Sequence, residues 1–312
     1  MLDTITNSLA FGLIAMVIVG GSWSLVGLVM GDAPKKGIDS SIVQFYSGFI
    51  PVSLGIILIG CQGGLTFENY SCRTFLFAFI CYGLGGFTNF FMLENMSKAM
   101  QRGPNGIIWS IIQSAMVFPF IVGILFFGVE INIFRILGII ALVASLVLFG
   151  LAKNNVSTGK SWKFLAFLCL AICAFQQNLM TIPSYYEEVR KISSITLTTM
   201  TSIGSLSAAI VFALTQKREY WQKLATGVKN VRLWQYILVL QGFSLVFAYT
   251  LFYPGMKVMG KAGLGGMCYP LLVGSCIVTF TLTSILFLKE KLQAIQAIAL
   301  VTCILGLVFI CL

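Results

Sequence analysis

The chain alternates long apolar stretches with short charged segments. Splitting the 312-residue sequence at every Asp, Glu, Lys and Arg leaves ten charge-free runs of at least 17 residues: 4–31, 40–67, 74–93, 103–129, 136–152, 164–186, 192–216, 233–256, 262–288 and 292–312. Each run is about long enough to cross a hydrocarbon layer of about 30 Å as a helix. The runs lack the apolar–polar alternation of barrel strands, and a helix satisfies its own backbone polar groups inside lipid. The pattern therefore predicts an all-α integral membrane protein with ten transmembrane helices.

An internal repeat groups these ten predicted helices as five plus five. With the sequence shifted by 160 positions against itself, similar residues coincide at Phe87/Phe247, Met96/Met256, Gly103/Gly263, Gly106/Gly266, Trp109/Tyr269, Phe127/Phe287 and Glu130/Glu290. We take residues 1–152 as the first five-helix repeat and residues 161–312 as the second. Because five is odd, the second copy enters the membrane from the opposite side, and the two halves are inverted. Inverted repeats of this kind are typical of alternating-access transporters.

The composition supports the membrane class and excludes several others. Apolar residues make up 58% of the chain and charged residues 10%, whereas about a quarter of an ordinary soluble domain is charged. The predicted helices leave no loop of the roughly 50 residues that a soluble catalytic domain needs. There is no His, which removes imidazole bases and His-liganded metals. The one adjacent acidic pair is Glu187-Glu188, whose side chains diverge by about 100° on a helix and are poorly placed to act together. We therefore expect that the protein is not an enzyme and that it binds no metal and no cofactor.

The basic residues are distributed unequally between the two predicted sides of the membrane. Of the 20 Lys and Arg residues, 14 fall in the connections after odd-numbered helices and six on the side that holds both termini. Cytoplasmic loops are the Lys/Arg-rich ones, so the sequence predicts a multi-pass protein, of a bacterial inner membrane, with both termini outside. The basic segment 217–232 carries Tyr220, Trp221 and Leu224 at near-helical spacing. We expect an interfacial amphipathic helix on anionic headgroups there, rather than a nucleic-acid patch.

The nine cysteines follow no metal-binding spacing. Cys61 and Cys72 flank the short connection between the second and third predicted helices. A disulfide between them and two free thiols are both compatible with the sequence, because a disulfide needs a specific Cα separation.

Two matched segments carry a family resemblance. Residues 127–130 (FGVE) run into 135–142, and residues 287–290 (FLKE) run into the final helix. They resemble a feature of the EamA-type repeats in the drug/metabolite transporter superfamily. In each such repeat an acidic residue stands at the start of the last helix and is followed by a helix with small residues. The resemblance covers essentially the whole chain. It implies ten helices in two repeats and transport of a small organic metabolite.

The chain departs from that family's pattern at two positions. Ile298 stands where the first copy has Gly138, and Gln44 lies where many members carry an arginine. An exporter subfamily that depends on this arginine is therefore less favoured. The segments 163–186, 217–232 and 241–253 look similar to the sugar-permease branch, of the L-rhamnose permease type. Many members, particularly eukaryotic ones, are described with both termini in the cytosol, which is opposite to the orientation predicted from the charges.

Polar and aromatic side chains within the helices are the candidate solute-binding residues, because polar groups in lipid are costly unless they face a cavity or one another. They are Trp23, Asn89, Trp109, Gln113, Gln176, Gln177, Asn178, Gln241, Tyr249 and Tyr269. Trp109 and Tyr269, which the repeat relates, are expected to form two facing aromatic walls with amides between them. Packing, or a hydrogen bond between helices, is the alternative role for each residue. Aromatic walls with neutral amides favour a sugar, polyol or similar solute over a bare ion.

Together these features predict an alternating-access transporter of a small, neutral, polar metabolite, with its site at mid-membrane between the repeats. An exporter of amino acids, amphipathic metabolites or drugs is the alternative, and a lipid carrier or channel is more remote. Glu94 is the nearest candidate for proton coupling, although an ion pair with Lys98 one turn later is favoured. The expected partners are the solute and the lipid bilayer, without nucleic acid, and the chain is expected as a monomer or weak homodimer.

Overall fold

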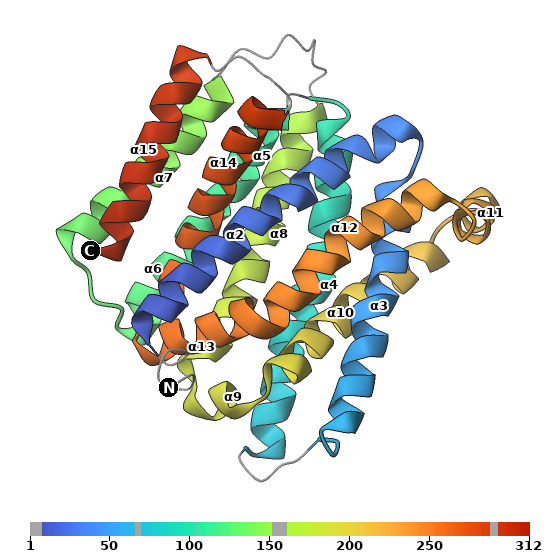
Figure 1. Ribbon diagram of the computed structural model, residues 1–312, viewed down its shortest axis with the longest axis horizontal. Coiled ribbons are helices and arrows are strands. Elements are labelled where there is room, and N and C mark those ends of the chain that lie inside the picture. Colours follow the sequence, from blue (N-terminus) through green and yellow to red (C-terminus); the bar gives the residue numbers. More distant parts are fainter. Residues whose placement is uncertain (1–7, 66–69, 104, 152–160, 288–292) are drawn as a thin grey trace.

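The computed structural model (Figure 1) describes residues 8–65, 70–103, 105–151, 161–287 and 293–312. These residues form helices and turns, with no strand among them. The α-helices are α2 (Leu9–Asp32), α3 (Ser40–Cys61), α4 (Cys72–Met100), α5 (Asn105–Gln113), α6 (Val117–Phe127), α7 (Ile133–Leu151), α8 (Ser161–Thr181), α9 (Glu187–Lys191), α10 (Ser194–Leu214), α11 (Arg218–Gly227), α12 (Val231–Phe247), α13 (Tyr253–Lys261), α14 (Cys268–Phe287) and α15 (Ala294–Cys311).

Eight helical segments of the described chain are long and apolar enough to cross a membrane. Two shorter apolar helices cover 133–149 and 265–279. The prediction of an all-helical chain with membrane-length apolar helices is therefore confirmed.

Two of the long segments are interrupted rather than straight. A 3₁₀ turn, η2 (Ser114–Met116), joins α5 to α6, and a π-helical turn, η4 (Ala248–Phe252), joins α12 to α13. Pro254 follows η4 at the start of α13. Proline removes a backbone donor and π-turns disturb the hydrogen-bond ladder, so both features bend a helix. The apolar pattern of residues 233–256 carried no sign of the π-turn.

Close helix packing is concentrated at glycines. A Cβ placed on Gly204 of α10 would lie 1.8 Å from the carbonyl oxygen of Gly83 in α4. A Cβ on Gly86 would lie 1.8 Å from the carbonyl oxygen of Thr201. At the other end of the fold, α7 and α15 lie side by side (Figure 1), and Gly138 and Gly306 each face the other's backbone. Membrane helices associate through such small residues, because lipid offers no hydrophobic drive between them.

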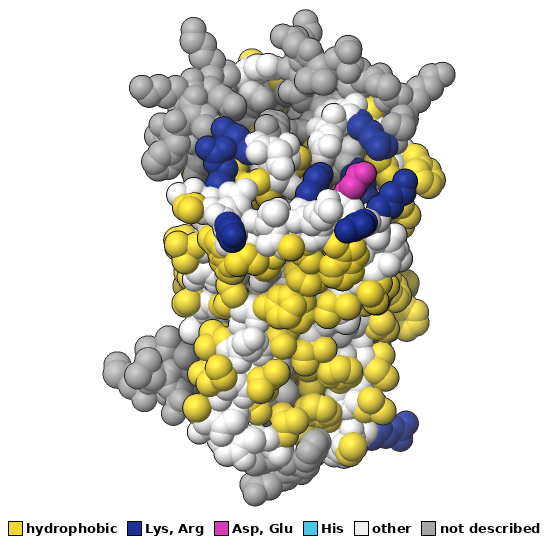
Figure 2. Space-filling view, turned by 90° about the vertical axis from the view of Figure 1, so that its right-hand side faces the viewer, with side chains coloured by type: hydrophobic (Ala, Val, Ile, Leu, Met, Phe, Trp, Pro, Cys, Tyr) yellow, Lys and Arg dark blue, Asp and Glu magenta, His cyan; other side chains and the backbone are white. Residues whose placement is uncertain are grey.

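Basic side chains gather near one end of the molecule, and apolar side chains cover its middle, on the face that Figure 2 shows. This is the pattern of a membrane protein with one positively charged side. Helix α11 falls within segment 217–232. Two contacts connect α11 to α3. The Tyr46 hydroxyl of α3 donates to the Leu224 carbonyl of α11 at 2.5 Å, and Lys223 of α11 forms a 3.1 Å ion pair with Asp39, the residue before α3.

Cys61 and Cys72 are both exposed free thiols. The disulfide that the sequence left open is therefore not formed in this structure.

Candidate functional site

A cavity of about 300 Å³ lies inside the helical bundle, and residues from both halves of the chain line it. Its walls come from α2, α3, α4, α5, α8, α10, α12, η4, α13 and α14. Among the described residues that line it there is no Asp, Glu, Lys or Arg. An uncharged cavity of this kind suits a small neutral ligand.

Eight of the ten candidates from the sequence line this cavity: Trp23, Asn89, Trp109, Gln113, Gln176, Gln177, Gln241 and Tyr269. The structure does not bring Asn178 and Tyr249 into it. Asn178 follows Gln177 by about 100° around α8, and its amide nitrogen donates to the Ala174 carbonyl of the same helix at 2.8 Å. Tyr249 lies in η4, where the π-turn changes the angular register of the side chains.

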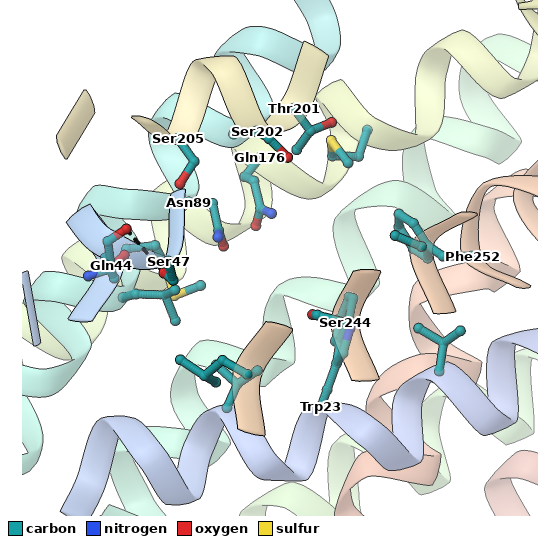
Figure 3. Close-up of a pocket in the computed structure, with 18 of the residues that line it drawn as sticks. Trp23, Gln44, Ser47, Asn89, Gln176, Thr201, Ser202, Ser205, Ser244 and Phe252 are labelled. Carbon is teal, nitrogen blue, oxygen red and sulfur yellow. Dashed lines mark hydrogen bonds between the residues drawn. The ribbon is translucent and has the colours of Figure 1, made fainter. Parts of the chain in front are cut away.

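One side of the cavity is polar. Figure 3 shows Gln44 and Ser47 of α3, Asn89 of α4 and Gln176 of α8 grouped with hydroxyl residues of α10. The amides of Asn89 and Gln176 point into the space between the helices (Figure 3). This side offers both donors and acceptors, because each primary amide carries both.

Two buried amide atoms in this wall have no hydrogen-bond partner among the described residues. They are Nε2 of Gln44 and Oε1 of Gln177, whose residues are 5% and 2% exposed. The other end of the Gln177 amide donates to the Cys173 sulfur at 3.2 Å. An unsatisfied buried polar group costs about 1–3 kcal/mol. Both atoms are therefore available to a polar ligand or to water in the cavity.

The opposite side of the cavity is aromatic. The Trp23 ring lies with its centroid 6.1 Å from Tyr269 and also 6.1 Å from Phe252. Figure 3 places Trp23 and Phe252 across the cavity from the amides. Tyr253 extends this side, and its hydroxyl lies 2.5 Å from the Thr201 hydroxyl on α10.

The expectation that Trp109 and Tyr269 form two facing aromatic walls with amides between them stays a prediction. Both line the cavity, but Trp23 is the tryptophan whose ring contacts Tyr269. Trp109 packs one turn further along α2, where its ring atoms lie 3.4 Å from the position of a Cβ on Gly27. Trp23 and Gly27, one turn apart on α2, thus contact the two repeat-related rings.

Glu94 does not line the cavity. Its carboxylate accepts a hydrogen bond from Ser40 at 2.6 Å and pairs with Lys98 at 3.2 Å. These contacts connect the end of α4 to the start of α3. The ion pair with Lys98 is the arrangement that the i, i+4 spacing favours.

Several lining residues were not among the sequence candidates. They are Gln44, Ser47, Thr198, Thr201, Ser202, Ser205, Ser244, Phe252 and Tyr253. On α10 the signal was present as hydroxyl residues spaced by three and four positions, which share one face. A helical hydroxyl satisfies itself on its own backbone, as Thr198 does with the Ser194 carbonyl at 2.8 Å. Such residues are therefore less informative than amides when only the sequence is known.

No family model matches this sequence, and no curated protein matches it. Among solved structures, 28 chains match. One of them, whose title reads only "Crystal structure of protein", has a TM-score of 0.66, covers 96% of this chain and 94% of its own, and is 12% identical. At this identity the likeness concerns the fold alone: nearly the whole helical arrangement recurs in another chain.

Proposed function

We propose that this protein is an alternating-access transporter of a small, neutral, polar organic metabolite. The observation that carries the proposal is the uncharged cavity of about 300 Å³, bordered by two buried amides with unpartnered atoms, Gln44 and Gln177. A polar solute that bonded to both atoms would remove the cost of leaving them unsatisfied. The facing aromatic side, at Trp23 and Tyr269, suits the apolar faces of a sugar or polyol ring.

A five-plus-five inverted repeat supports this mechanism. Helix α4 packs against α8, and its counterpart at the 160-residue shift, α12 with α13, packs against α2. Helix α14 packs against α2, and its counterparts α5 and α6 pack against α8. These two contacts between the halves thus each have a counterpart at the repeat-related helices, as expected if two similar units surround one site.

The lining of the cavity shows the same correspondence. Helix α3 begins at Ser40 and helix α10 at Ser194, so these two helices align at a shift of 154 residues. This shift places Gln44 on Thr198 and Ser47 on Thr201. Gln44, Ser47, Thr198 and Thr201 all line the cavity. A site built from equivalent positions of two halves can be exposed to either side by a change in one pair of helix contacts.

The second candidate, an exporter of amphipathic metabolites or drugs, is favoured by a different part of the same cavity. The methionines Met30, Met92, Met96 and Met180 line it together with the aromatic residues. Flexible methionine side chains adapt to apolar ligands of different shapes. A solute with one apolar face and several hydroxyls would suit both sides of the cavity.

Solute binding can be tested by thermal unfolding of the purified protein with sugars, polyols, amino acids, purines and quaternary amines. A ligand that binds the folded state raises its stability by RT ln(1 + [L]/Kd), so millimolar binders are detectable in excess. We expect the largest rise with a neutral polyhydroxy compound. The Gln177→Ala variant should lose this rise.

Asn178→Ala is the matched control, because it removes the neighbouring amide outside the cavity. This variant should keep the ligand-dependent rise in stability. Counterflow of the same solute in proteoliposomes should likewise be lost in Gln177→Ala and kept in Asn178→Ala. The proposal is contradicted if no solute in the set stabilises the protein, or if both variants respond to the solute equally.

A further inference from the structure

A second hollow, of about 400 Å³, lies between α3 and α12. It is lined by Ile50 of α3 and by Trp234, Ile237, Leu238, Gln241, Gly242 and Leu245 of α12. Gln241 and Leu245 also line the central cavity. The two spaces therefore meet at one turn of α12, and we call the second one the lateral groove.

The lateral groove is apolar and open. Among the described residues that line it, Gln241 is the one amide, and the others are apolar apart from the Trp234 indole nitrogen. Leu238 is 72% exposed, and no heavy atom beyond the local helix lies within 4 Å of a Cβ placed on Gly242. Since α3 and the segment Val231–Lys261, which contains α12, are apolar and long enough to cross a membrane, hydrocarbon is the environment that this surface is suited to meet.

Positive charge lies at one end of the lateral groove. Trp234 marks this end, and its indole nitrogen donates to the Val228 carbonyl at 2.8 Å. Lys229 directly follows Val228, is exposed, and forms no ion pair with a described residue. A tryptophan with a neighbouring basic residue is typical of the level of lipid headgroups.

We propose that an anionic phospholipid binds here, with one acyl chain in the lateral groove and its phosphate near Lys229. The acyl chain would complete the wall of the central cavity where α3 and α12 leave it open, beside Gln241 and Leu245. The observations that carry this are the apolar lining, the unpaired cation Lys229 at one end and the shared wall. The inference does not rest on the proposed solute, and its test contains none.

Tryptophan quenching by brominated lipid locates the acyl chain. The whole protein is reconstituted in phosphatidylcholine vesicles that contain a few percent of phosphatidylglycerol with brominated oleoyl chains. We expect quenching that is mostly lost in Trp234→Phe, and about tenfold weaker binding of brominated phosphatidylcholine at the same fraction, since each nearby Lys or Arg strengthens attraction to an anionic headgroup.

Two glycine variants test whether the groove holds the chain. Gly242→Leu fills the lateral groove, whereas Gly60→Leu adds the same side chain at an exposed position of α3 that also has no neighbour within 4 Å. Quenching should fall severalfold in Gly242→Leu and stay unchanged in Gly60→Leu. If Gly242→Leu does not fold, Leu238→Ser serves as the groove variant.

The variant Lys229→Gln tests the headgroup, and it should remove the preference for phosphatidylglycerol. Equal quenching by the two brominated lipids in the unaltered protein would overturn the proposal and indicate only the ordinary lipid annulus. Equal quenching in the two leucine variants would overturn it as well. Neither result would affect stabilisation by a solute, so failure here is distinct from failure of the transport proposal.

Discussion

The pairs α4–α10 and α3–α12 occupy equivalent places in the proposed repeat, yet they pack differently. At α4–α10 the backbones touch, since Gly86 of α4 and Gly204 of α10 leave no room for a Cβ. At α3–α12 the lateral groove separates the helices, and Gly242 faces open space. One pair is closed by backbone contact and the other is left open. In the alternating-access cycle proposed above, this asymmetry would correspond to one end state.

The largest effect is expected from breaking the closed pair. Gly204→Val would place a branched side chain against the Gly83 carbonyl, so α4 and α10 must separate. Overpacking of this kind costs typically 1–3 kcal/mol, and we expect the upper end because backbone rather than a flexible side chain is in the way. A lower midpoint of thermal unfolding in detergent checks this. An unchanged midpoint would mean that the glycine contact does not hold the pair.

A smaller effect is expected from Glu94→Gln, which tests the link from the closed pair to the open one. The change weakens the bond from Ser40 of α3 and removes the ion pair with Lys98. Hydrogen bonds to charged groups contribute about 1.5–3 kcal/mol, and we expect a loss near the lower value because Lys98 is partly exposed. Transport measured with and without a proton gradient separates this structural role from coupling. A gradient dependence that disappears in Glu94→Gln would support coupling instead.

Tyr46→Phe tests whether α11 holds α3 in place at the open pair α3–α12. It removes the hydroxyl that ties α3 to the Leu224 carbonyl of α11, and a single neutral hydrogen bond contributes about 0.5–1.5 kcal/mol. We expect this modest loss of stability together with faster labelling of Ile50→Cys by a membrane-permeant thiol reagent, because α3 is held less firmly. Unchanged labelling would show that α11 does not restrain the open pair.

The smallest effect is expected at Gly242→Ala, the counterpart of the glycine change in the closed pair. The added methyl meets nothing within 4 Å, and Ala is favoured over Gly in a helix by about 1 kcal/mol. The midpoint of thermal unfolding should therefore stay the same or rise slightly. A clear decrease would show that α3 and α12 approach each other closely in the protein's predominant state.

The helical class and most of the candidate cavity could be predicted from the sequence, for reasons that particular residues make clear. Gln176 and Gln177 were conspicuous because an amide in an apolar run is costly unless it faces protein, water or a ligand. Gln44 was noticed only as a departure from a family pattern, and its position in the cavity wall follows from the packing of α3. Asn178 shows the limit of the argument, because its amide does find a carbonyl on its own helix.

Local pattern also says little about how helices turn relative to one another. Tyr249 was grouped with the other polar and aromatic candidates, but the π-turn in residues 248–252 rotates the following side chains, so that Phe252 and Tyr253 line the cavity instead. A π-turn depends on packing around the helix and on Pro254 one turn on, and the apolar content of the run is the same with or without it.

Hydropathy by itself determined the class of this protein, because charge-free runs of this length leave the backbone no alternative to helices inside lipid. The unequal distribution of Lys and Arg determined that one end would be basic. Only the tertiary structure decided which polar groups meet, that Trp23 rather than Trp109 packs on Tyr269, and that α4–α10 is closed while α3–α12 is open. Those outcomes depend on contacts between segments far apart in the chain, where a shift of one helical turn exchanges one set of facing side chains for another.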